Sequence, residues 1–268
     1  MNRRPASAQA AAALAAAARA GPYFAVEPFD GGEGWRPLRA LVSDPAVLAE
    51  RVAHAAGALA RGAGIAPAAV DKRVAASVVF GGLAARLVSP ALGAAVLGGV
   101  VPLLTVDDLW WRPADSGPWP LAARPADGPA VGRLATGQQL GAAAALISEH
   151  CIQGMTGPVS AAFGTAFGLS PQVRRGNVAS ALAGAAGVLA AAFPERAGAA
   201  WELTAVILGQ RPLRGAGELV QPDPAQARRF LVRRSCCLIY RVPGAGICGD
   251  CVLLPEEVRR RQWQAAAG

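Results

Sequence analysis

Lysine and histidine are nearly absent from this sequence, and it carries none of the familiar catalytic motifs. Of its 26 basic residues only Lys72 is a lysine, and the histidines are His54 and His150 alone. The chain contains no recognisable Ser-His-Asp triad, no phosphate-binding loop and no dinucleotide fingerprint. The sequence therefore shows no recognisable motif for nucleophilic, acid–base or nucleotide-dependent catalysis.

Charged residues are also scarce, at 16% against 53% hydrophobic residues, and this composition excludes a disordered polymer. A chain of 268 residues can bury a large core without disulfides, as one large domain or two small ones. The net charge of +8 comes almost entirely from arginine and indicates an anionic partner. An acidic protein or an anionic small molecule is favoured over nucleic acid, because the excess is modest.

The sequence has no convincing leader or membrane span. Residues 1–21 begin with two arginines and continue in alanine, which imitates a signal peptide, but Leu14 is the only leucine there. We expect residues 1–34 to form a helical or frayed N-terminal arm. The uncharged stretch 87–106 contains two prolines and the stretch 176–194 is mostly alanine and glycine, so both are predicted to be buried helices.

The periodicity predicts a mainly α protein, with a helical body over 35–220. Asp44 begins a helix that we expect to end at Gly62, and a second run from Val70 is predicted to stop at Pro90. A proline-rich connection over 112–133 precedes a helix at 140–147, a patch broken by glycines, and helices at 177–193 and 201–208. No alternating pattern is long enough for a sheet, except a short hairpin near the C-terminus. Three tryptophans lie in this connection or directly before it, and we interpret them as core residues rather than as a ligand site: Trp110, Trp111 and Trp119.

Residues 221–268 differ in composition and are predicted to form a separate C-terminal segment. Pro224 is expected to start a short basic helix that runs through Arg234, and Pro255 a closing helix. Four of the five cysteines lie between these two helices: Cys236, Cys237, Cys248 and Cys251. Cys151 stands apart and is interpreted as an ordinary buried thiol.

Four thiols within sixteen residues indicate a metal site in a reducing compartment. Such a set suits either tetrahedral zinc or a 2Fe-2S cluster. The adjacent pair Cys236 and Cys237 would chelate a single small ion awkwardly, whereas Cys248 and Cys251 fit either group. Nearby residues could compensate the charge of the thiolates or dock a partner: Arg233, Arg234, Tyr240 and Arg241.

The Cys-Cys, ten residues, Cys, two residues, Cys spacing resembles that of the FhuF-type ferric-siderophore reductases. All four cysteines match, and the segments VAASVVFGGLAARLVSPALGA from Val74 and RGNVASALAG from Arg175 look similar to the helical body of that family. The resemblance implies a cytoplasmic oxidoreductase for iron acquisition, in which the four cysteines ligate the iron of a 2Fe-2S cluster. A ferric siderophore would be its substrate, and an external protein or small reductant would supply the electron.

Two alternatives from other classes stay open at this point. The four cysteines could hold structural zinc in a module that binds an acidic protein or nucleic acid. A siderophore-biosynthesis enzyme is disfavoured, because no nucleotide-binding signature is present. Arg228 and Arg229 could dock an acidic electron donor or simply form a solvated face, and the sequence also allows peripheral contact with a membrane surface.

Overall fold

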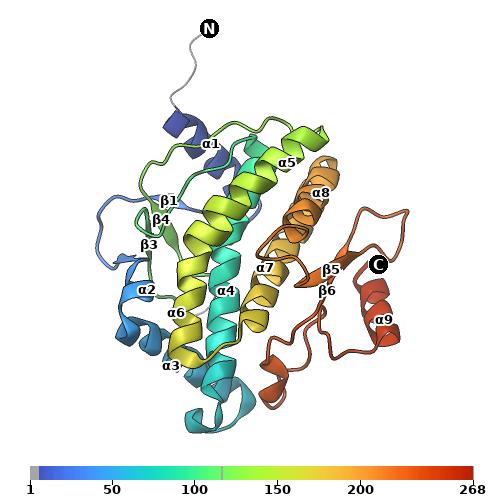
Figure 1. The fold of residues 1–268 in the computed structure, drawn as a ribbon. Helices are drawn as coiled ribbons and strands as arrows, with labels where there is room; N and C mark the ends of the chain where they lie inside the picture. Colours follow the sequence, from blue (N-terminus) through green and yellow to red (C-terminus); the bar gives the residue numbers. More distant parts are fainter. Residues whose placement is uncertain (1–5, 116, 268) are drawn as a thin grey trace.

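The computed structural model describes residues 6–115 and 117–267, and the predicted mainly α class is confirmed (Figure 1). The α-helices are α1 (Ala6–Ala18), α2 (Ala40–Ser43), α3 (Pro45–Ala63), α4 (Lys72–Gly93), α5 (Gly137–Leu146), α6 (Gly157–Phe167), α7 (Pro171–Ala192), α8 (Ala197–Leu208) and α9 (Glu256–Ala267). Two π-helical segments extend them, Ala94–Gly98 after α4 and Ile147–Thr156 between α5 and α6.

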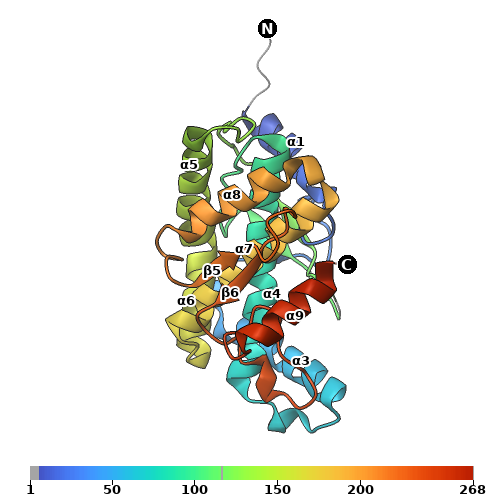
Figure 2. The same cartoon turned by 90° about the vertical axis from the view of Figure 1, so that its right-hand side faces the viewer.

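Helices α4 and α7 lie side by side at the centre of the molecule and form its most extensive helix pair (Figures 1 and 2). The prediction that Pro90 ends the first of these helices is wrong, because α4 runs on to Gly93. Leu92 and Val96 beyond the proline are buried, and their burial offsets the hydrogen bond that Pro90 cannot make. The chain leaves the helix only at Gly99, which adopts the left-handed conformation with φ +66°.

The alanine-rich N-terminal run forms α1, which packs against the end of α4. A Cβ at Gly93 would lie 2.9 Å from Ala17 Cβ, and one at Gly98 only 2.4 Å from Ala13 Cβ. The two backbones thus approach as closely as glycine and alanine allow. The basic start of the run, residues 1–5, lies outside the described residues.

A small sheet contradicts the expectation that the helical body contains none. Its strand order is β1-β4-β3-β2, built from Glu27–Pro28, Leu121–Ala123, Leu109–Trp111 and Arg36–Pro37. Strands of two or three residues cannot display an alternating pattern, so these strands could not be recognised from the sequence. Trp111, at the end of β3, is fully buried and stacks on Trp119, while Trp110 of the same strand stacks on Phe29.

The second half of the body contains a correction as well. The patch that the glycines were expected to break is helical throughout, because the π-helical segment joins α5 to α6. Cys151 lies in it, 3% exposed, and its thiol donates to Leu87 O at 3.5 Å. Burial raises the pKa of Cys151 to about 12, as expected for an inert core thiol.

The C-terminal segment opens with a hairpin of β5 (Gly217–Val220) and β6 (Phe230–Arg233). The predicted basic helix from Pro224 to Arg234 is therefore wrong: residues 224–229 form a turn and an irregular stretch, and cross-strand pairing with β5 holds residues 230–233 extended. The hairpin packs on α7 and α8, and α9 closes the chain beyond the cysteines (Figure 2). The proposed domain boundaries stay a prediction.

One helical stretch of the described chain, Lys72–Gly98, is long and apolar enough to cross a membrane. The most apolar window of this stretch is 78% buried inside the fold. Core helices of soluble proteins pass the same test, so the finding is weak support for a span.

Candidate metal centre

The four clustered cysteines lie on the loop between β6 and α9, which packs against α4 through Ile239–Arg241. None of them forms a disulfide, and Cys251 is buried. The sulfurs of Cys237 and Cys248 are 3.4 Å apart. Two thiolates on one tetrahedral metal, with metal–sulfur bonds of about 2.3 Å, are separated by roughly 3.8 Å. Cys237 and Cys248 thus already have nearly the spacing of two ligands that share a metal.

Backbone amides point at the sulfurs of this loop. Leu238 N–H donates to Cys236 Sγ at 3.2 Å and Leu253 N–H to Cys251 Sγ at 3.4 Å. Leu238 has φ +73°, a strained value for a side chain of this kind, and it turns the chain directly after the cysteine pair. N–H groups aimed at sulfur stabilise thiolate charge, and such hydrogen bonds tune iron–sulfur centres.

The close thiol pair is electrostatically asymmetric. The hydrogen bond with Cys248 lowers the pKa of Cys237 to about 6, helped by the Ile239 N–H and the Arg233 guanidinium. The same hydrogen bond raises the pKa of Cys248, and burial raises that of Cys236. Of the two thiols Cys237 is thus the one that loses its proton more readily, and a metal that binds both sulfurs would displace the shared proton.

The arrangement of the four cysteines distinguishes a 2Fe-2S cluster from a single zinc ion. Over residues 6–115 and 117–267, no group of three or more His, Cys, Asp or Glu side chains is gathered closely enough to hold one metal ion. Cys237 and Cys248 instead form one close pair. The sulfurs of Cys236 and Cys251 each accept a hydrogen bond from a backbone N–H of the same loop. A cluster with two irons takes its thiolates in pairs, so the set fits this group better than a single zinc ion.

Arg233 connects the cysteine loop to the central helices. Its side chain is 3% exposed, and Nη2 donates to Asn177 Oδ1 at 2.7 Å. Asn177 Nδ2 in turn donates to Ser77 O at 3.0 Å, and Ser77 Oγ donates to Cys237 O at 2.7 Å. Arg233 N–H also donates to Asp250 O at 3.0 Å, which ties β6 to the loop before Cys251.

The buried charge of Arg233 has no carboxylate partner among the ion pairs of the described residues. An unpaired buried cation is costly unless an anion faces it. The thiolates are the anionic groups that this guanidinium reaches, since its charge lowers the pKa of both Cys236 and Cys237, though it is not the largest influence on either. The predicted compensating role of Arg233 is thus consistent with its position.

The other predicted neighbours lie on the surface. Arg234 and Tyr240 are exposed, and Arg241 forms an ion pair with Asp71 at 3.4 Å at the start of α4. Arg228 is exposed and lies over the Phe230 ring, and Arg229 is half-buried, both on the loop that leads to β6. The docking role of these side chains stays a prediction.

Sequence reasoning missed the helical residues of this site. Ser77, Asn177 and Ser180 belong to the two central helices, and Ser180 Oγ donates to Asp250 Oδ2 at 2.5 Å. These polar residues stand out within alanine-rich helices, which was the available signal. Nothing in the sequence showed that they meet a loop some 60 to 160 residues further along the chain.

Comparison with known proteins bears on the cysteine loop. Residues 233–253 match the family model of the FhuF 2Fe-2S C-terminal domain. The match begins at the buried Arg233 and contains all four cysteines, which fit the motif. No curated protein matches the chain. The chain therefore carries a FhuF-type 2Fe-2S C-terminal domain, and with it a 2Fe-2S cluster.

Proposed function

We propose that this protein is a one-electron ferric-siderophore reductase that releases iron as Fe(II) in the cytoplasm. The observation that carries the proposal is the FhuF-type 2Fe-2S domain, whose cysteines Cys237 and Cys248 face a groove in the helical body. We assign Cys236, Cys237, Cys248 and Cys251 as the cluster ligands. When bound, the cluster supplies single-electron chemistry.

Reduction alone is sufficient to free the iron. Hard oxygen ligands hold Fe(III) much more tightly than Fe(II), so one electron weakens the chelate without any bond to the protein. The electron leaves the protein for Fe(III), and an external protein or small reductant then restores it. Near the thiolates, Arg233 offsets negative charge, while its hydrogen bonds through Asn177 and Ser77 fix the cysteine loop on the body.

A single-turnover experiment tests the proposal. Anaerobically purified protein is analysed for iron, sulfide and zinc, reduced with dithionite, freed of excess reductant and mixed with ferric desferrioxamine. We expect two irons and two sulfides per chain, and one Fe(II) captured by ferrozine per cluster as the absorption of the oxidised cluster returns. Cys248→Ser should lose both the colour and the turnover.

The same experiment can refute the proposal. A reduced cluster that stays reduced in the presence of ferric chelates, yet is oxidised by ferricyanide, would show that the protein is an electron carrier of another pathway. Colourless protein with one zinc per chain would overturn the ligand assignment itself and leave a zinc-stabilised module.

A further inference from the structure

A groove of about 440 Å³ runs between α4 and α7 on the side of the cysteine loop. The sulfur-bearing residues Cys237 and Cys248 line one end of it. Tyr23, Phe24 and Val188 line the other end, and Tyr23 and Val188 are 40% and 45% exposed. The groove therefore leads away from the metal centre toward an exposed apolar rim.

The groove is longer than a cysteine-bound group requires. Its lining follows α4 from Ser77 to Ser89 and α7 from Asn177 to Val188, which at 1.5 Å per residue is roughly 17 Å. Small residues form its walls along this length, namely Gly81, Gly82, Ala85, Ala181, Gly184 and Ala185. The small size of these residues, rather than a separation of the two helices, leaves the space of the groove.

The charged groups of the groove gather at the cysteine end. Arg233 lines it, and its buried Nε–H has no hydrogen-bond acceptor within the described residues. The carboxylate of Asp250 lines the same end and accepts from Ser180. Arg233 and Asp250 carry opposite charges at this end, and a free buried donor is a group that a ligand can satisfy.

We propose that this groove is the docking site of the ferric chelate. A mostly apolar chelate of low net charge lies along α4 and α7, with its metal end toward Cys237 and Cys248 and an oxygen acceptor facing Arg233. This inference rests on the proposed function and adds to it the place and the surface chemistry of the substrate. One electron passes from the reduced centre to Fe(III), which becomes Fe(II), and the external reductant restores the centre.

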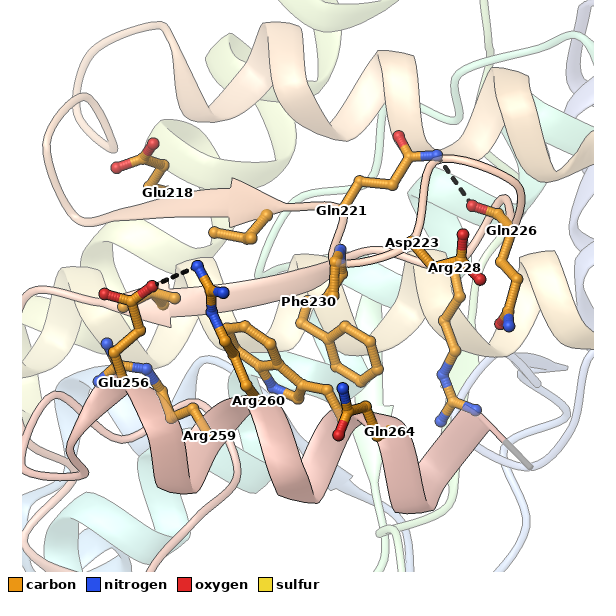
Figure 3. A pocket seen from close by; sticks show the side chains of 14 residues that line it. Glu218, Gln221, Asp223, Gln226, Arg228, Phe230, Glu256, Arg259, Arg260 and Gln264 are labelled. Atoms are coloured by element: carbon orange, nitrogen blue, oxygen red, sulfur yellow. Dashed lines mark hydrogen bonds and ion pairs between the residues drawn. The ribbon is translucent and has the colours of Figure 1, made fainter.

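A larger groove elsewhere does not meet these requirements. It measures about 810 Å³ and lies between the hairpin and α9 (Figure 3). Its charged residues partly neutralise each other, as in the ion pair between Arg260 and Glu256 at 2.7 Å. No cysteine lines it. The groove between α4 and α7, in contrast, is lined by Cys237 and Cys248 themselves.

Leucine substitutions at two groove glycines test the proposal. A Cβ at Gly82 or Gly184 meets no atom within 4 Å, so the backbone has room for a side chain at either position, and Gly82→Leu and Gly184→Leu add apolar bulk to the groove. Both positions are helical, where leucine is favoured over glycine, so the variants should fold. Gly198→Leu is the matched control, because Gly198 is helical, equally free of contacts and outside the groove.

The expected result separates docking from electron transfer in general. Gly184→Leu and Gly82→Leu should keep the iron content and the midpoint potential of the wild type. Each should lower the second-order rate of oxidation by ferric desferrioxamine by about tenfold or more. Oxidation by ferricyanide, a small ion that needs no groove, should stay within about twofold, and Gly198→Leu should match the wild type with both oxidants.

Each outcome decides one question. Unchanged rates with ferric desferrioxamine in both groove variants would overturn the docking site while leaving the reductase intact. If the wild type does not reduce the chelate, the proposed function fails, and binding of redox-inert gallium desferrioxamine then tests the groove alone. Binding that is lost in Gly184→Leu and kept in Gly198→Leu supports the site, and no binding to the wild type refutes it.

Discussion

Gly176 is the point at which α7 touches the chain that enters the cysteine loop. A Cβ there would lie 2.1 Å from Ser235 Oγ and 2.8 Å from Arg233 Nη2, and real Cβ atoms essentially never make contacts this short. Gly176→Ala must therefore displace both side chains. Because Ser235 immediately precedes Cys236, the displacement reaches the metal centre.

Gly184, a second glycine of α7, provides the comparison that measures the stability cost of the contact at Gly176. Overpacking of a filled site costs about 1–3 kcal/mol, and replacing a helical glycine by alanine gains about 1 kcal/mol. Gly184→Ala has the gain without the contact, since nothing lies within 4 Å of a Cβ at that position. The propensity gain is common to both variants, so Gly176→Ala should be less stable than Gly184→Ala by about 1–3 kcal/mol.

Anaerobic thermal unfolding of the cluster-loaded protein, followed with iron content and visible absorption, measures this difference. For a chain of this size each kcal/mol corresponds to roughly 2–4 °C in Tm. The double variant Gly176→Ala/Ser235→Ala should regain part of the loss, because the 2.1 Å contact disappears. If Gly176→Ala matched Gly184→Ala in Tm with a full complement of iron, α7 and the cysteine loop could not be packed as described.

Three further variants probe buried cations and a buried thiol, one of them beside the centre and two in the helical body. Arg233→Met removes the buried cation, so the midpoint potential should fall by on the order of tens of millivolts, with Arg233→Lys retaining most of it; an unchanged potential would place the guanidinium away from the centre. Arg86, 2% exposed, donates to three main-chain carbonyls, and burial lowers its pKa to about 10. Arg86→Leu should therefore lower the free energy of unfolding by about 3 kcal/mol or more in urea titrations, and a loss below about 1 kcal/mol would contradict this role. Cys151→Ser should keep the cluster and its activity, and the wild-type thiol should resist iodoacetamide at pH 8 until denaturant is added, because its pKa is about 12.

The sequence was sufficient for the metal centre because its ligands are local. Four thiols in one short loop need no tertiary contact to be recognised. The helix that begins after Asp44 could be predicted equally well. The Asp44 side chain accepts a hydrogen bond from the Ala46 N–H, and Pro45 occupies the first helical position. Local chemistry decided both features.

Errors arose where tertiary packing overrides local preference. Pro90 normally ends a helix, but the buried residues beyond it keep α4 helical. The arginine-rich stretch before Cys236 resembled a helix, yet Phe230–Arg233 is held extended by β5. The core that buries the residues beyond Pro90 and the strand that pairs with Phe230–Arg233 can both be identified only from the fold.

Helix α7 shows why the groove in particular was invisible in the sequence. Its residues Gly176, Ser180, Gly184 and Val188 follow one another at four-residue spacing, which places them on a single ridge of the helix. On that ridge Gly176 leaves room for the chain at Arg233 and Ser235, and Ser180 donates a hydrogen bond to Asp250. Gly184 has no side chain to fill the groove that it lines. Since α4 and α8 cover the remaining faces, α7 is nearly apolar all round and has no amphipathic pattern to read. A helix whose functional face consists of glycine and serine can be recognised only when the loop that it receives is in place.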